Sequence, residues 1–126
     1  IMISHLGAVD FPSMQTRGVT LEMVVRRHAR AMEKLQSRVD ASADPSKGHL
    51  LIIDAGDVQI TRMLRALELW QSVNKIGSTY YPELLGKLIL VRCPQAADWV
   101  LAAVTAFLDD DTKAKMQFFC GADATP

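Results

Sequence analysis

Two short motifs carry side chains suited to phosphate or metal chemistry. Gly86-Lys87 could end a phosphate-binding loop, but Tyr81 stands where the first glycine is needed and Leu88 where a serine or threonine is needed. Asp109–Asp111 offers carboxylates to a cation, yet it lacks the alternating acids and central glycine of a calcium loop. We therefore expect these acids to cap the short helix that follows, because negative charge is favourable at a helix N-terminus.

The remaining metal-ligating and nucleophilic residues lie far apart. The histidines and cysteines show no zinc spacing; they are His5, His28, His49, Cys93 and Cys120. We expect His28 to be a buried, hydrogen-bonded histidine, and the two cysteines to be small buried hydrophobes in a reducing compartment. Nucleophile-elbow, zinc-protease, Walker and Rossmann patterns are absent. No catalytic residue, metal or cofactor is predicted, and a non-enzymatic binding domain is favoured.

The strands and helices that must position these residues alternate along the chain. We expect strands at Ile1–Val9, His49–Asp54, Leu88–Cys93 and Lys115–Cys120, and helices at Thr20–Arg38, Gln59–Lys75 and Gln95–Leu108. The two central strands are continuous apolar runs, which are typical of strands buried on both faces of a parallel sheet. The alternation predicts an α/β fold with a mainly parallel sheet.

The first predicted helix is strongly amphipathic. Thr20 is a suitable N-cap, and one face of the helix is apolar. The other face sets five cations against Glu22 and Glu33; they are Arg26, Arg27, Arg30, Lys34 and Arg38. Such a face is usually only solvated, and contact with a membrane or anionic lipid is the alternative.

Length and composition restrict the class of protein. The chain has 126 residues, 49% of them hydrophobic, with 14 basic and 14 acidic side chains. This fits one domain over 1–126 and argues against intrinsic disorder and against a strongly basic nucleic-acid binder. The longest apolar stretch, Trp99–Leu108, is too short for a membrane span, which needs about twenty residues. The start at Ile1, with no visible leader, suggests a piece of a longer protein.

Four blocks of sequence, in order, resemble the CRAL-TRIO lipid-binding domain family. The most specific is Tyr80–Pro94, which contains a Tyr-Pro-Glu turn, a Gly-Lys pair, an apolar strand and a closing proline. His49–Asp54 is similar to a family strand that ends in aspartate, and Phe107–Lys115 is similar to the Phe-Leu-Asp-x-x-Thr-x-x-Lys segment. Leu6–Asp10 is similar to an early strand and its exit. The resemblance covers essentially the whole chain.

The resemblance implies a hydrophobic pocket floored by the sheet and closed by a mobile amphipathic gate helix. Members bind phosphoinositides, phosphatidylcholine, tocopherol, retinoids or sterol-like molecules and exchange them between cytosol and membranes. The gate would be Gln95–Leu108, with four residues facing ligand or bilayer: Trp99, Val100, Ala103 and Phe107. By the residues alone, this stripe would simply pack on the core. The implied protein is cytoplasmic and peripherally membrane-associated, with a phospholipid or other hydrophobic ligand and transient membrane contact.

The resemblance also implies a headgroup site. In phosphatidylinositol-binding members, the glutamate of the Tyr-Pro-Glu turn and the threonine and lysine of the Thr-x-x-Lys segment hold the inositol phosphate; Glu83, Thr112 and Lys115 match them. An ammonium pairs with phosphate, a hydroxyl donates to it, and a carboxylate accepts from inositol hydroxyls. A structural ion pair between Glu83 and Lys115 is the alternative.

Departures from the family pattern refine these expectations. His49 and Leu51 stand where phosphatidylcholine-binding members carry hydroxyl residues, so choline-lipid binding is not expected. Leu84 replaces a common arginine, and Arg92 replaces the asparagine of Asn-Ala-Pro, adding charge near the strand end or pointing to solvent. The N-terminal helical lobe and the C-terminal end of the family are missing from this sequence.

The predicted function is binding, with possible intermembrane transfer, of phosphatidylinositol or another lipid. The alternative is a protein-interaction or membrane-targeting module of a signalling protein related to small GTPases or their activating proteins.

Overall fold

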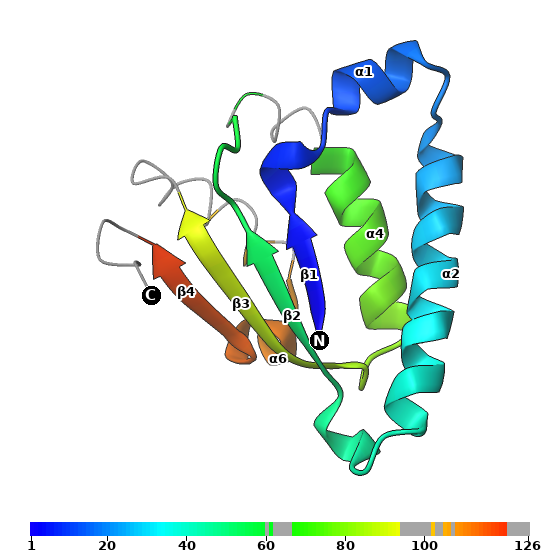
Figure 1. The fold of residues 1–126 in the computed structure, drawn as a ribbon, viewed down its shortest axis with the longest axis vertical. Coiled ribbons are helices and arrows are strands. Elements are labelled where there is room, and N and C mark those ends of the chain that lie inside the picture. Colours follow the sequence, from blue (N-terminus) through cyan, green and yellow to red (C-terminus); the bar gives the residue numbers. More distant parts are fainter. Residues whose placement is uncertain (60, 62–66, 94–101, 103–104, 107, 121–126) are drawn as a thin grey trace.

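A parallel sheet of four strands forms the centre of the computed structural model, which describes residues 1–59, 61, 67–93, 102, 105–106 and 108–120. The strand order is β1-β2-β3-β4 (Figure 1). The strands are β1 (Met2–His5), β2 (His49–Asp54), β3 (Leu85–Cys93) and β4 (Met116–Cys120). Every neighbouring pair is parallel, which confirms the predicted α/β class.

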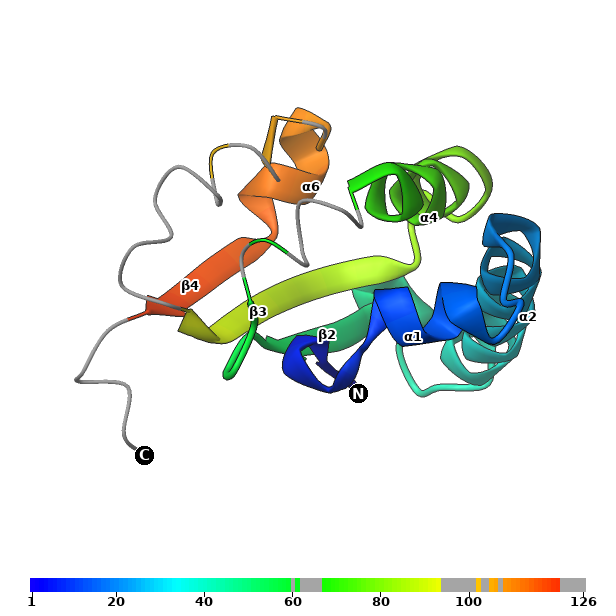
Figure 2. The ribbon, with the colours of Figure 1, turned by 90° about the horizontal axis from the view of Figure 1, so that it is seen from above.

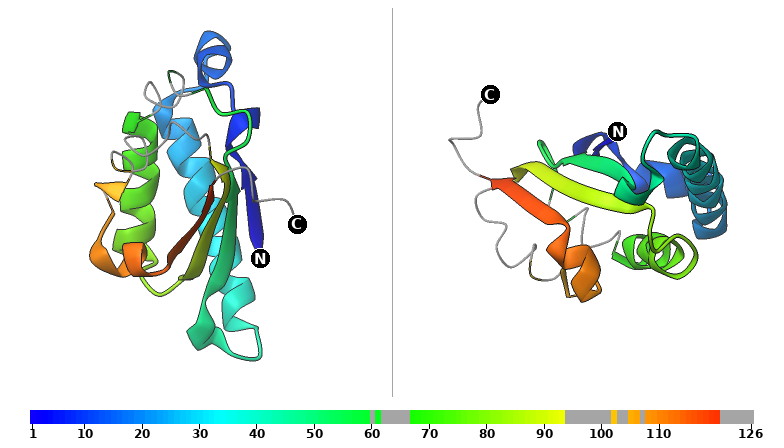
Figure 3. Two further views of the ribbon diagram at one scale, coloured as in Figure 1. Left: turned by 90° about the vertical axis from the view of Figure 1, so that its left-hand side faces the viewer. Right: turned by 90° about the horizontal axis from the view of Figure 1, so that it is seen from below.

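The helical elements connect successive strands. They are η1 (Leu6–Ala8), α1 (Phe11–Thr16), α2 (Leu21–Asp40), η2 (Pro45–Lys47), α4 (Leu67–Tyr80) and α6 (Asp110–Ala114). α4 and α6 cover the same face of the sheet (Figures 2 and 3). This follows from the strand order, because right-handed crossovers that always step to the next strand in one direction place their helices on one side. α2 packs against α4.

Local sequence explains most of the element boundaries. The Thr20 hydroxyl accepts a hydrogen bond from the Met23 amide at 3.2 Å, so the predicted N-cap of α2 is confirmed. The Asp10 carboxylate caps α1, a helix that we did not predict, by accepting from the Ser13 amide. α4 extends to Tyr80, beyond the predicted end of the second helix at Lys75.

The first and third strands differ from the prediction in length. β1 ends at His5, where a turn of 3-10 helix begins, rather than at Val9. β3 begins at Leu85, three residues before the predicted start, and it carries an irregular register beside β2. Most of the predicted helix Gln95–Leu108 lies outside the described residues.

Two buried clusters hold the elements together. The first is centred on β3 and consists of Ala55, Leu88, Leu90 and Cys93. Cys93 is disulfide-bonded, which differs from the expectation of a free thiol, and the sheet register sets it opposite Cys120. The second cluster joins Met32 and Val39 of α2 to Leu84, which is only 1% exposed. Leu84 therefore anchors the turn before β3 against α2.

Candidate functional site

The amino-terminal ends of the parallel strands lie along one side of the sheet, which we call the amino edge. The turn before β3, the start of β2 and the end of α6 lie there. The Leu84 carbonyl accepts from the His49 amide at 2.8 Å and from His49 Nδ1 at 2.6 Å. Because a carbonyl can only accept, Nδ1 of His49 carries the proton. His49 is 7% exposed, and this burial is the largest influence on its pKa, which is lowered. A neutral histidine thus ties the turn to β2.

Two glycines let the chain segments at this edge approach closely. Gly48 has φ +59°, and a β-carbon there would lie 2.7 Å from the Gly86 nitrogen and from the Leu84 oxygen. Gly86 is the residue that β3 inserts between the partners of His49 and Leu50, and a β-carbon on it would overlap the Lys47 carbonyl oxygen. The glycine of the Gly-Lys pair is therefore a close-packing position between β3 and the segment before β2.

Two of the three predicted headgroup residues lie close together, Thr112 within α6 and Lys115 as the C-cap of this helix. Asp109 accepts from the Thr112 amide at 2.7 Å and from the Thr112 hydroxyl at 2.9 Å, so the expected acidic cap is confirmed. These two hydrogen bonds, amide first, lower the pKa of Asp109. One turn further, Lys115 Nζ lies 2.6 Å from an Asp111 carboxylate oxygen. The Lys115 side chain is 23% exposed.

Glu83 lies on the same edge but on the other side of β3. Its neighbour Leu84 bonds to β2, whereas the Lys115 carbonyl accepts from the Leu88 amide on the β4 side. Glu83 is exposed. The ion pair of Lys115 is with Asp111, and within the described residues none joins Lys115 to Glu83. The structure therefore places the predicted set at one edge of the sheet, and the alternative of an ion pair between Glu83 and Lys115 is not formed among the described residues.

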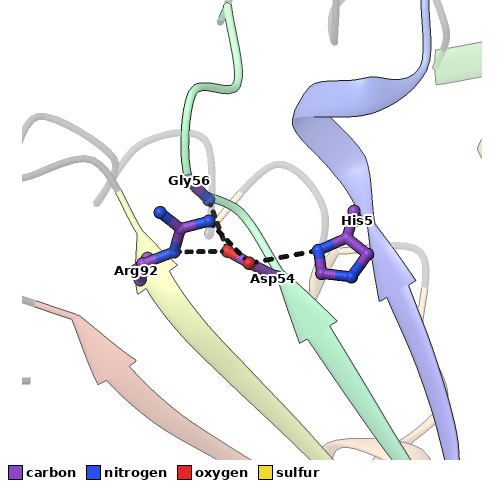
Figure 4. A network of polar contacts seen from close by, with 4 residues as sticks. All are labelled: His5, Asp54, Gly56 and Arg92. Atoms are coloured by element: carbon purple, nitrogen blue, oxygen red, sulfur yellow. Dashed lines mark hydrogen bonds and ion pairs between the residues drawn. The ribbon is translucent and has the colours of Figure 1, made fainter. Parts of the chain in front are cut away.

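The carboxyl edge of the sheet carries a polar network that the sequence did not predict (Figure 4). Asp54, at the end of β2, accepts from Arg92 Nε at 2.8 Å and from Arg92 Nη2 at 2.6 Å. It also accepts from the Gly56 amide at 3.0 Å and lies 3.2 Å from His5 Nδ1. The ends of three neighbouring parallel strands are thus linked through one carboxylate.

Charge and hydrogen bonding determine the ionisation of this network. The hydrogen bonds from Arg92 are the largest influence and hold the pKa of Asp54 well below its usual range, with the Gly56 amide second. The same contact raises the pKa of Arg92. The Asp54 side chain is 14% exposed, whereas that of Arg92 is 56% exposed. Arg92 therefore adds charge at the strand end while its guanidinium remains open to solvent.

Gly56, two residues after the aspartate, lies directly against the side chain of Arg92. A β-carbon on Gly56 would overlap the guanidinium of Arg92. Arg92 itself has φ +55°, a conformation that residues other than glycine seldom adopt. The signal in the sequence was that parallel strands end at one edge, so their terminal side chains meet; the sequence separation of 38 positions between the partners conceals it.

The predicted gate residues, Trp99, Val100, Ala103 and Phe107, all lie outside the described residues. Among the helices that the structure does describe, none has the length and apolar character to cross a bilayer.

Comparison with known proteins decides the family. The sequence model of the CRAL/TRIO domain matches residues 6–124. The chain belongs to the CRAL/TRIO domain family. The resemblance inferred from the sequence is thereby confirmed, and the parallel sheet described above is the sheet of a CRAL/TRIO domain.

Two curated relatives are similar to this CRAL/TRIO domain over nearly its whole length. One is the phosphatidylinositol/phosphatidylcholine transfer protein SFH11 of Arabidopsis thaliana, 32% identical over 123 residues, which are 93% of this chain and 32% of that protein. The other is the SEC14 cytosolic factor of Yarrowia lipolytica, 29% identical over 124 residues, which are 94% of this chain and 25% of that protein. The chain spans about a third or less of the length of these relatives.

A solved structure supports the fold. The crystal structure of Sfh5 superposes with a TM-score of 0.78 at 24% identity, covering 93% of this chain and 41% of that one. The same arrangement of parallel strands and crossover helices is therefore shared with a known protein structure.

Proposed function

We propose that this CRAL/TRIO domain binds a membrane lipid and transfers it between bilayers without catalysing a reaction. The observation that carries the proposal is the family match over residues 6–124, together with a relative that is described as a phosphatidylinositol/phosphatidylcholine transfer protein. The cytosolic factor from Yarrowia lipolytica supports a cytoplasmic protein that meets membranes transiently. The relatives described above give no support to the alternative of a GTPase-related interaction module.

Within this function, we assign phosphatidylinositol as the ligand. Three features of the amino edge support the assignment. Lys115 provides an ammonium whose partner, Asp111, is 71% exposed and easily exchanged for a phosphate. Thr112 lies one turn away, and its hydroxyl, which donates to Asp109 in this structure, would have to exchange that exposed partner for the phosphate. Glu83 provides an exposed carboxylate able to accept from inositol hydroxyls.

The start of β2 argues against a choline headgroup. Leu51 is apolar, and the Nδ1 proton of the buried His49 is committed to the Leu84 carbonyl. Neither residue supplies the hydroxyl group that the family uses there for phosphatidylcholine. For the acyl chains we assign the space between the sheet and the predicted gate helix, Gln95–Leu108, with Trp99, Val100, Ala103 and Phe107 as its apolar contacts.

A vesicle transfer assay tests the proposal. The purified chain is mixed with donor vesicles that contain labelled phosphatidylinositol and with unlabelled acceptor vesicles, and transfer is compared with that of labelled phosphatidylcholine. We expect transfer of phosphatidylinositol, reduced in Glu83→Gln and in Lys115→Ala. Equal transfer by the wild type and both variants would exclude the headgroup assignment, and no transfer of either lipid would count against the function itself.

A further inference from the structure

The outer face of α2 carries four cations in a single line. Arg27, Arg30, Lys34 and Arg38 are all exposed. At 3.6 residues per turn they fall within a sector of about 80° and extend over about 16 Å of the helix. We call these four residues the cationic stripe.

The sector of the stripe contains no acidic residue, and the nearest acid of α2, Glu33, is one turn from Arg30 in the adjoining sector. The acids of α2 lie in the adjoining sector, where Glu22 pairs with Arg26 at 2.6 Å and Asp40 accepts from Gln36. Within the part of the chain that the structure describes, no ion pair involves a residue of the cationic stripe. Because the whole chain has zero net charge, the stripe is a local concentration of positive charge rather than part of a general excess.

The stripe points away from the body of the domain. The opposite side of α2 buries Met32 and Val39 against the turn before β3. In Figures 1 and 3, α2 is the outermost helix beyond β1, with α4 beside it. The sector of the stripe also contains Met23, which is 56% exposed. A row of cations with an exposed apolar side chain at its N-terminal end suits a bilayer interface, where phosphates meet acyl chains.

We propose that the cationic stripe is a docking surface for an anionic phospholipid bilayer. Its single sign of charge and straight course match a laterally continuous anionic surface. Three of its four cations are arginines, whose planar guanidinium binds phosphate through two parallel hydrogen bonds. The inference deepens the proposed function, on which it rests for its membrane, by naming the surface through which the domain meets donor and acceptor bilayers.

Vesicle cosedimentation tests this surface directly. The 126-residue chain is mixed with phosphatidylcholine vesicles that contain or lack phosphatidylserine, and three proteins are compared: wild type, Arg30→Gln/Lys34→Gln, and Lys47→Gln/Lys75→Gln. The last is a charge-matched control, since it removes two exposed cations from other elements. Each cation lost beside an anionic surface lowers partitioning about fivefold, so the stripe variant should bind phosphatidylserine vesicles about 30-fold more weakly than wild type. The control should bind them within about threefold of wild type.

The outcomes separate this inference from the proposed function. Equal vesicle binding by the stripe variant and the control, or equal wild-type binding to both kinds of vesicle, would overturn the docking surface. Retention of the wild type on polyglutamate beads without vesicle binding would overturn it in favour of an acidic protein partner. Native mass spectrometry on the same proteins reports bound lipid independently. A chain that takes up no lipid, yet loses vesicle binding in the stripe variant, would refute the proposed function and retain the docking surface.

Discussion

Substitution of Lys115 by alanine should weaken phosphatidylinositol binding without unfolding the domain. Among the described residues, the ion pair of this ammonium is with Asp111, an i,i+4 partner whose carboxylate is largely exposed. Such a surface pair contributes about 0.5 kcal/mol, so its loss should lower the melting temperature by about 2 °C. A hydrogen bond to a charged phosphate contributes about 1.5–3 kcal/mol, which corresponds to a roughly 10- to 100-fold loss of affinity.

Lys113 provides the matched control, because it lies on the same helix and pairs with Asp110 at 3.2 Å. The assay is a titration of the chain with phosphatidylinositol vesicles, followed by quantification of the lipid extracted per chain. Lys113→Ala should leave uptake within about twofold of wild type, while Lys115→Ala should lower it by the factor above. Equal losses in both variants would show that charge on α6 acts non-specifically, and no loss in either would refute the headgroup role of Lys115.

Three further predictions concern the framework that positions the site. Gly86→Ala should lower the free energy of unfolding by about 1–3 kcal/mol, because the added methyl group would overlap a backbone carbonyl. Gly77→Ala in α4 is the control, since its methyl group would meet open space and should not destabilise the chain; urea titrations measure the free energy of unfolding of both variants. Leu84→Ala should cost about 3 kcal/mol and lower the melting temperature by roughly 10 °C, since Leu84 is 1% exposed; a shift under about 3 °C would contradict the anchoring role. The pKa of Asp54 is depressed by Arg92, so the folded state holds fewer protons than the unfolded chain and the stabilisation present at neutral pH is lost on acidification below about pH 5. Thermal melts should show that the melting temperature falls less on acidification in Asp54→Asn than in the wild type. Parallel dependence of the two melting temperatures on pH would contradict the stabilising role of the Asp54–Arg92 contact.

The elements that could be predicted are those with strong local signals. β2 coincides with its apolar run at His49–Asp54, and α2 begins after its Thr20 cap. The cap at Asp109 was also predictable, because acids before a short helix have a local role. The parallel sheet followed from the alternation of strands and helices, whereas the strand order β1-β2-β3-β4 was not predicted, because right-handed crossovers are compatible with several orders.

Features that depend on distant residues could not be predicted. β3 begins early because Leu85 and Gly86 join the sheet through close approach to the segment before β2, which is a property of the partner backbone. The contact of Asp54 with Arg92 depends on strand register and on a positive φ at Arg92. Neither can be read from local propensity.

The candidate site depends on the family rather than on the residues alone. No spacing pattern singles out Glu83, Thr112 and Lys115, which lie in two segments separated by β3 and the predicted gate helix. The structure places them on one edge of the sheet, and their role in binding a headgroup stays a prediction.

The most direct test of lipid binding is native mass spectrometry of the chain after incubation with mixed phosphatidylinositol and phosphatidylcholine vesicles. Removal of the vesicles leaves only lipid that the protein holds. We predict a species with one phosphatidylinositol per chain, in excess over any phosphatidylcholine adduct. A chain that remains free of lipid, or that takes up only phosphatidylcholine, would contradict the proposal of a phosphatidylinositol-binding domain.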